Sequence, residues 1–96
     1  MRRDEALTLL SRHRDDLKGF GVKSLHLFGS LARDEAGPES DADLLVEFDR
    51  PVGLFAFIRL QSFLEGVLGR RVDLVTAGAL KSGLRERIQK EAVRAA

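Results

Sequence analysis

The chain has 96 residues, no cysteine and a formal net charge of +1. Chains divide into several cores only beyond roughly 250 residues, so we expect a single domain over residues 1–96. The lack of cysteine excludes disulfides and thiolate metal sites, and the balanced charge argues against non-specific attraction to nucleic acid. No apolar run approaches the ~20 residues of a transmembrane helix, so we expect a soluble, cytoplasmic protein.

The first part of the chain predicts a helix, a strand and a short helical piece. Apolar residues recur at helical spacing over residues 3–18, and Gly19 then ends the helix. Residues 22–28 form a short, mostly apolar run that indicates a strand. Gly29 and Ser30 then turn the chain into a helical piece that continues through residues 31–33.

The rest of the chain alternates strands and helices. Residues 43–48 and 71–76 indicate strands, and residues 54–68, rich in leucine and phenylalanine, indicate a helix between them. Residues 80–95 predict a last helix with an apolar stripe and a basic remainder. This order predicts an α/β fold in which a small three-stranded sheet, mixed or parallel, is backed by helices on one side.

Two aspartates stand at the start of the second predicted strand. Asp41 and Asp43 are one residue apart, so in an extended chain both side chains point to one face, with Cα atoms roughly 6.5 Å apart. Carboxylates that close repel each other unless a cation lies between them. Asp73 adds a third if its strand neighbours that of Asp43. Three oxygen donors favour Mg²⁺ or Mn²⁺, and Mg²⁺ usually completes its shell with substrate phosphates, which points to a nucleotide.

Gly29 and Ser30 are suited to bind the phosphates of that nucleotide. Glycine at a strand end lets the backbone approach a phosphate closely, and the following helical N terminus presents free N–H groups. The Ser30 hydroxyl adds a donor, and Arg33 is near enough in sequence to reach the same anion. Each feature alone is commonly structural, but their order and spacing together favour a metal-dependent nucleotide site.

The run that reads "GS", ten further residues, "DAD" and "LLV", residues 29–46, closely resembles the nucleotidyltransferase signature of the DNA polymerase beta superfamily. The branch it resembles is the minimal nucleotidyltransferase (MNT) group, whose members are about this long. The resemblance covers nearly the whole chain. Many relatives have glycine after the arginine, whereas Asp34 follows Arg33 here.

The resemblance implies a fold, a set of ligands and an acceptor. The fold would be a small mixed sheet with helices. Asp41 and Asp43 would bind two metal ions with the help of Asp73, and Gly29 and Ser30 would contact the triphosphate of ATP. Members of this size typically pair with a HEPN-domain protein, as antitoxin to its ribonuclease toxin, and the resemblance implies transfer of AMP to a tyrosine hydroxyl of that partner. We expect the partner to complete the site, because so small a domain has little surface for selecting an acceptor.

Two other functions remain open from the sequence. A non-catalytic antitoxin would neutralise its partner by binding alone, although an intact set of three acids counts against this. An enzyme that modifies tRNA or an antibiotic would need a further substrate domain, and the basic C-terminal part has no aromatic residues beside its charges on which bases could stack.

Overall fold

The computed structural model describes residues 1–79, 86, 88 and 90–96. In chain order its elements are the helices α1 (Arg3–Arg12) and α2 (Arg14–Gly19), strand β1 (Val22–Phe28), helix α3 (Gly29–Ala32), strand β2 (Ala42–Phe48), helix α4 (Leu54–Leu68), strand β3 (Val72–Thr76), the 3₁₀ turn η1 (Ala77–Ala79) and strand β4 (Val93–Arg94).

The strands form one mixed sheet in the order β3-β2-β1-β4. Strands β1 and β2 are antiparallel, β2 and β3 are parallel, and β4 lies antiparallel to the outer edge of β1. The parallel pair is possible because α4 carries the chain back between β2 and β3. The expected α/β fold with a small mixed sheet is thus confirmed.

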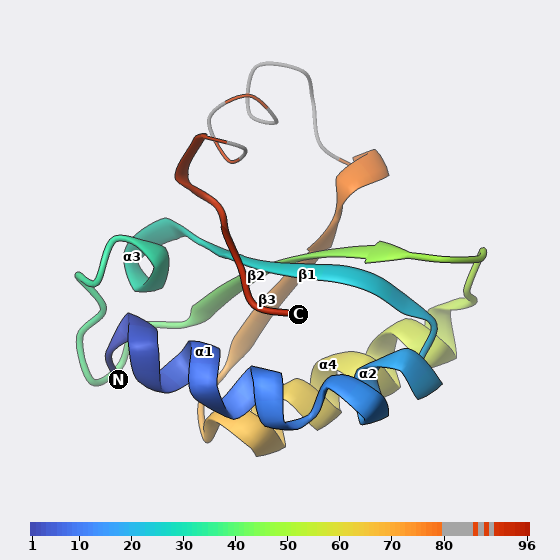
Figure 1. The fold of residues 1–96 in the computed structure, drawn as a ribbon, viewed down its shortest axis with the longest axis horizontal. Coiled ribbons are helices and arrows are strands. Elements are labelled where there is room, and N and C mark those ends of the chain that lie inside the picture. The colour runs from blue at the N-terminus through green and yellow to red at the C-terminus, as the bar shows by residue number, and fades with distance from the viewer. Residues whose placement is uncertain (80–85, 87, 89) are drawn as a thin grey trace.

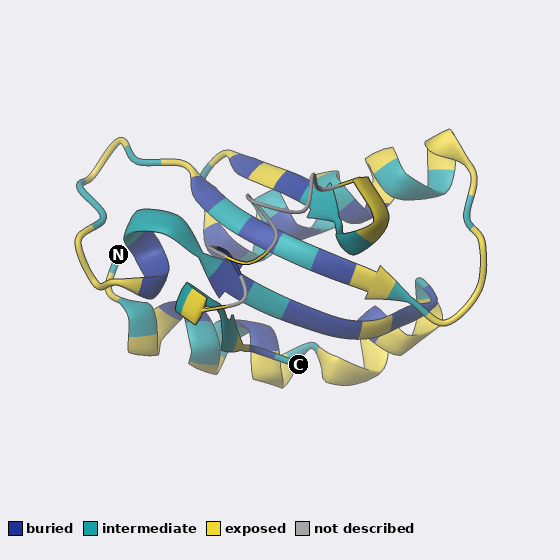
Figure 2. Ribbon diagram, turned by 90° about the horizontal axis from the view of Figure 1, so that it is seen from above, coloured by how far each residue is buried: buried dark blue, intermediate teal, exposed yellow. Residues whose placement is uncertain are grey.

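The helices α1, α2 and α4 cover one face of the sheet (Figure 1). Burial alternates along β2, where Ala42, Leu44 and Val46 are buried toward these helices. Figure 2 shows the same alternation from the side opposite the helices. The largest fully buried side chains form the core between the layers: Leu10, Leu17, Leu25, Leu27, Leu31, Leu44, Val46, Leu60 and Leu64. The opposite face of the sheet carries Asp43 and Asp73 beside apolar residues such as Leu45 and Val75.

The predicted helix over residues 3–18 is wrong in one respect, because it is broken at His13. The His13 N–H bonds to Leu10 O at 3.1 Å, a tighter turn than an α-helix makes. Its ring packs edge-on against Phe63 of α4, with centroids 5.5 Å apart. Apolar periodicity does not reveal the break, because Leu10 and Leu17 still face the core on either side of it.

The C-terminal part corrects two further expectations. Half of the helix predicted over residues 80–95 lies outside the described residues. Val93–Arg94 form strand β4 instead of helix, so the sheet has four strands in the described part of the chain. Ala95 N bonds to Leu25 O at 2.8 Å, which continues the pairing along the edge of β1. Unpaired backbone groups at a sheet edge favour such pairing over local helix propensity.

In the described part of the chain, no helix combines the length and the apolar character that crossing a bilayer requires.

Candidate active site

The predicted site residues meet at one end of the sheet. Strand β1 is antiparallel to β2, and β3 is parallel to β2. The last residues of β1 therefore lie at the same end of the sheet as the first residues of β2 and β3. In register, Phe28 pairs with Asp43, and Asp43 pairs with Asp73. Gly29 directly follows Phe28, so the turn into α3 borders the same place.

Asp43 and Asp73 project from the same face of the sheet. Their strand neighbours Ala42, Leu44 and Val72 are buried on the helix-covered side, and side chains alternate along a strand. Asp43 is half-buried and Asp73 is exposed, both on the face turned away from α1, α2 and α4. Neighbouring strands lie ~4.8 Å apart, so two carboxylates in register are held near each other. The sequence-based expectation that these two acids share a face agrees with this arrangement.

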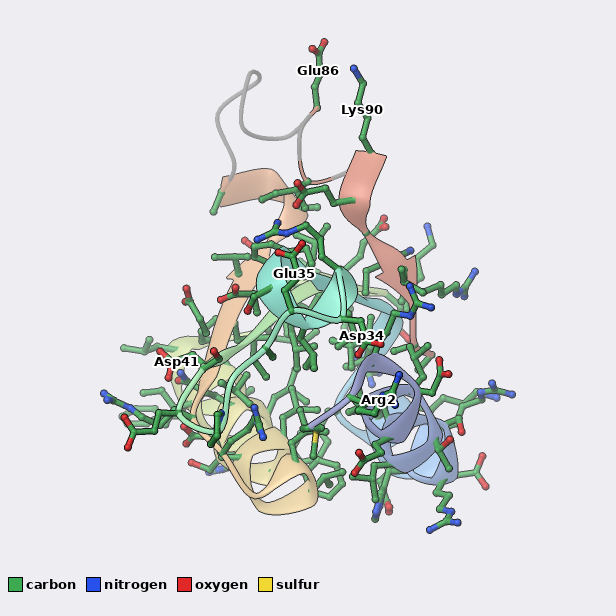
Figure 3. The ribbon with its side chains drawn as sticks, turned by 90° about the vertical axis from the view of Figure 1, so that its left-hand side faces the viewer. Arg2, Asp34, Glu35, Asp41, Glu86 and Lys90 are labelled. Carbon is green, nitrogen blue, oxygen red and sulfur yellow. The ribbon has the colours of Figure 1, made fainter. Side chains whose placement is uncertain are left out.

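Asp41 lies on the exposed segment just before β2 (Figure 3). Burial raises the pKa of Asp43, the charges of Asp73 and Asp41 raise it further, and Arg33 lowers it. Two like charges therefore act on Asp43. Such repulsion is what a bound cation would relieve.

The donor set fits a hard divalent ion. Three carboxylates supply oxygen ligands of the kind that Mg²⁺ accepts, and the chain has no cysteine. Among the described residues no three acidic or histidine side chains already stand as a ready ion-binding cluster. The carboxylates therefore share a region, and their side chains would have to turn toward an ion to bind it.

Gly29 lies against Asp43. It has a φ of +69°, in the left-handed region that favours glycine. A Cβ at this position would collide with the Asp43 carboxylate. Ser30 follows at the first turn of α3 and is half-buried, with its carbonyl accepting the Glu35 N–H at 2.8 Å. The missing side chain at residue 29 thus leaves room directly beside an acid of the site.

Arg33 is engaged by two carboxylates. Its Nε donates to Glu35 Oε2 at 3.1 Å, and its Nη1 donates to Glu91 Oε2 at 3.0 Å. The hydrogen bond to Glu35 is the main reason why the pKa of Arg33 is raised. Arg33 is near enough to act on the charge of Asp43. Arg33 therefore lies beside the site, and its guanidinium is hydrogen-bonded to two carboxylates of the chain itself.

Asp34 shows how the chain accommodates the residue after Arg33. Its φ is +60°, a conformation that glycine adopts without strain. Its carboxylate accepts the Arg3 N–H at 2.9 Å at the start of α1, and this hydrogen bond is the main reason why the pKa of Asp34 is lowered. The aspartate thus joins the turn after α3 to α1, a link that glycine could not make.

Sequence reasoning missed two residues beside the site. Glu91 contacts Arg33 from 58 positions away, and Arg70 donates to Ser40 O from 30 positions away. The sequence shows both only as members of a charged C-terminal stretch, because no local spacing connects them to the motif.

His26 is packed rather than placed at the site. It pairs in register with Arg94 of β4, in the middle of the sheet. Burial, and then the charge of Arg94, lower the pKa of its imidazole, which therefore stays neutral at pH 7.

Comparison with known proteins places these features in one family. A family profile described as the nucleotidyltransferase domain matches residues 10–95. The chain is 42% identical over 91 residues to the protein adenylyltransferase MntA of Thermococcus cleftensis, covering 94% of this chain and 92% of that protein. A solved structure described as a candidate minimal nucleotidyltransferase is 36% identical with a TM-score of 0.85, covering 97% of this chain and 95% of the other.

A more distant structure shares the fold. It is described as a tri-AMPylated Shewanella oneidensis HEPN toxin in complex with an MNT antitoxin, with 19% identity and a TM-score of 0.67, covering 94% of this chain and 71% of the other. At that identity the likeness concerns the fold alone. The family match, the extent of the identity to an adenylyltransferase and the mixed sheet with its acids beside a glycine turn agree, and the chain belongs to the nucleotidyltransferase domain family.

Proposed function

We propose that this protein is an antitoxin that transfers AMP from ATP to a tyrosine hydroxyl of a HEPN-domain toxin, with which it forms a hetero-oligomer in the cytoplasm. The observation that carries the proposal is the register of Asp43 with Asp73 beside the Gly29 turn. The name of the Thermococcus relative supports the reaction, and the Shewanella complex supports the kind of acceptor.

Asp41, Asp43 and Asp73 would hold two Mg²⁺ ions, for which Mn²⁺ can substitute. Bound there, the ions would supply charge that favours ionisation of the attacking hydroxyl and stabilises the departing pyrophosphate. Of the two acids on the sheet, Asp73 is the more exposed, and its strand is the one farther from Gly29. We therefore propose that Asp73 accepts the proton of the attacking hydroxyl.

Gly29, Ser30 and Arg33 would bind the triphosphate. The backbone of Gly29 can approach a phosphate because no side chain fills the space beside Asp43. The Ser30 hydroxyl and the Arg33 guanidinium donate hydrogen bonds to phosphate oxygens. The bond that forms joins the acceptor oxygen to the α-phosphorus, and the bond that breaks releases pyrophosphate.

A labelling experiment tests the transferase. With [α-³²P]ATP and Mg²⁺, we expect label on the co-expressed HEPN partner, and we expect its loss on adding EDTA or in the double variant Asp41→Asn, Asp43→Asn. Asp49→Asn, an exposed aspartate after the other end of β2, is the matched control and should label normally. Labelling that survives the double change would refute the assigned acids.

The same variants separate the catalytic antitoxin from one that acts by binding alone. Cells that express the partner toxin should lose protection when both acids are changed, provided that the variant still copurifies with the toxin. Continued protection by a copurifying double variant would favour neutralisation by binding.

Releasing Arg33 from Glu91 should strengthen ATP binding. In Glu91→Gln an internal anion no longer competes with phosphate for the guanidinium, and we expect the KM for ATP to fall about two- to fivefold, the range of an exposed ion pair. Glu86→Gln makes the same charge change in a side chain that points away from the body of the protein (Figure 3). If steady-state kinetics give both variants the same KM for ATP, Glu91 does not compete with phosphate for Arg33.

A further inference from the structure

We infer that a hollow beside Asp41 binds an acidic segment of the acceptor polypeptide, through Arg70 and Arg71. The hollow measures ≈ 390 Å³ and lies between residues 38–41, which precede β2, and residues 69–71, which precede β3. The inference rests on the proposed transferase function and adds to it the means by which the acceptor is recognised.

The hollow lies on the side from which the acceptor must come. In an in-line displacement the attacking and leaving oxygens are on opposite sides of the phosphorus. Gly29 follows β1, so pyrophosphate leaves on the β1 side of Asp43, and the acceptor approaches from the β3 side. Arg70 and Arg71 lead directly into β3, which places them on the approach to Asp73.

Arg70 is held in place by the two segments that form the hollow. Its Nη1 donates to Ser40 O at 3.2 Å, immediately before Asp41. The Ala42 N–H donates to Arg71 O at 2.9 Å, which fixes the turn that carries Arg70 against the start of β2. Within the described part of the chain, Arg70 Nε is buried and has no hydrogen-bond partner. The guanidinium is therefore preorganised beside the hollow.

The charge of the hollow favours an anion once the metal ions are bound. No ion pair among the described residues includes Arg70 or Arg71, whereas Arg33 has two acidic partners. Of the two acids that line the hollow, Asp41 is assigned to the metal ions, which leaves Glu39 against two arginines. Since the triphosphate lies on the β1 side, the anion that suits this hollow belongs to the acceptor: glutamates or aspartates that flank the accepting hydroxyl.

Peptide binding tests the subsite without requiring catalysis. The probes are two fluorescein-labelled peptides, a tyrosine flanked on each side by two glutamates and the same peptide with glutamines, measured by anisotropy with Mg²⁺ present. We expect the glutamate peptide to bind at least about tenfold more tightly, and we expect the preference to vanish in Arg71→Glu and to weaken as salt rises. Arg71 is the residue to change because its side chain is exposed, whereas Arg70 also holds the Ser40 carbonyl.

Arg59→Glu is the matched control. It makes the same charge change on an exposed arginine of α4, ten positions before the turn at Gly69, which is about 15 Å along the helix. The preference for the glutamate peptide should persist in this variant. Equal or undetectable binding of the two peptides by the unchanged protein, or an equal loss of preference in Arg59→Glu, would overturn the subsite.

Kinetics with the partner toxin as acceptor give a second readout. Arg71→Glu should raise the KM for the toxin about tenfold and leave the KM for ATP and the kcat unchanged, because the change acts on acceptor binding alone. The transferase function and the acceptor subsite can be refuted separately. If labelling does not depend on Asp41 and Asp43, the transferase is refuted. If labelling is intact but Arg71→Glu leaves the KM for the toxin unchanged, only the subsite is refuted.

Discussion

Replacing Asp43 with asparagine is expected to abolish AMP transfer and at the same time to stabilise the fold. The carboxylate would be a metal ligand, and metal ions supply several kcal/mol of transition-state stabilisation, so we expect the rate to fall about 10³-fold or more. In the metal-free protein Asp43 is half-buried and faces the charges of Asp73 and Asp41. Removing one of two like charges in register on neighbouring strands should raise the free energy of unfolding by about 0.2–1 kcal/mol.

The effect of Asp43 on the stability of the fold is expected to depend on pH. The pKa of Asp43 is raised in the folded state above its ordinary value of 3.8, so the folded protein holds its proton more strongly than the unfolded chain does. The destabilisation by Asp43 is therefore complete above the raised folded pKa and disappears below pH 3.8. In thermal melts with EDTA at pH 7, the melting temperature of Asp43→Asn should exceed that of the unchanged protein by roughly 1–6 °C. This gain should disappear toward pH 3.5, while Asp49→Asn should show no gain at pH 7. A melting temperature lowered by Asp43→Asn at pH 7 would contradict the electrostatic account.

Replacing Gly29 with alanine is expected to impair both folding and transfer. Its φ of +69° suits glycine, and the added Cβ would collide with the Asp43 carboxylate. We expect the free energy of unfolding to fall by about 1–3 kcal/mol. Displacing the carboxylate by even ~1 Å should reduce the rate of AMP transfer about 100-fold, because catalysis depends on ligand position.

Gly21→Ala separates the conformational effect from the steric one. Gly21 has a similar φ of +83°, but the atom nearest to its added Cβ is the Arg50 Nε, at 2.9 Å. That atom belongs to an exposed, flexible side chain that can move aside. Denaturant unfolding should therefore show a loss of about 1–2 kcal/mol for Gly21→Ala, with transfer retained. If Gly29→Ala transfers AMP as well as Gly21→Ala does, the close approach of Gly29 to Asp43 has no catalytic significance.

The local elements could largely be predicted from the sequence because they follow from local physical signals. Apolar spacing placed α4 at Leu54–Leu68, and Gly69, which adopts a φ of +65°, ends it. Short, mostly apolar runs placed β1, β2 and β3 within a residue of their observed bounds. The order and spacing of glycine, serine and the aspartates indicated the family from the sequence, because the motif lies in one continuous stretch from the start of α3 to the start of β2.

The sequence by itself determined most of the local elements and the family, and it predicted the acids of the proposed site, since burial periodicity and motif spacing are properties of short stretches. Only the tertiary structure decided which acids share a face, that β4 closes the edge of β1, and that Glu91 and Arg70 reach the site. These features depend on strand register and on contacts between residues 30 to 58 positions apart, and no local pattern encodes such contacts.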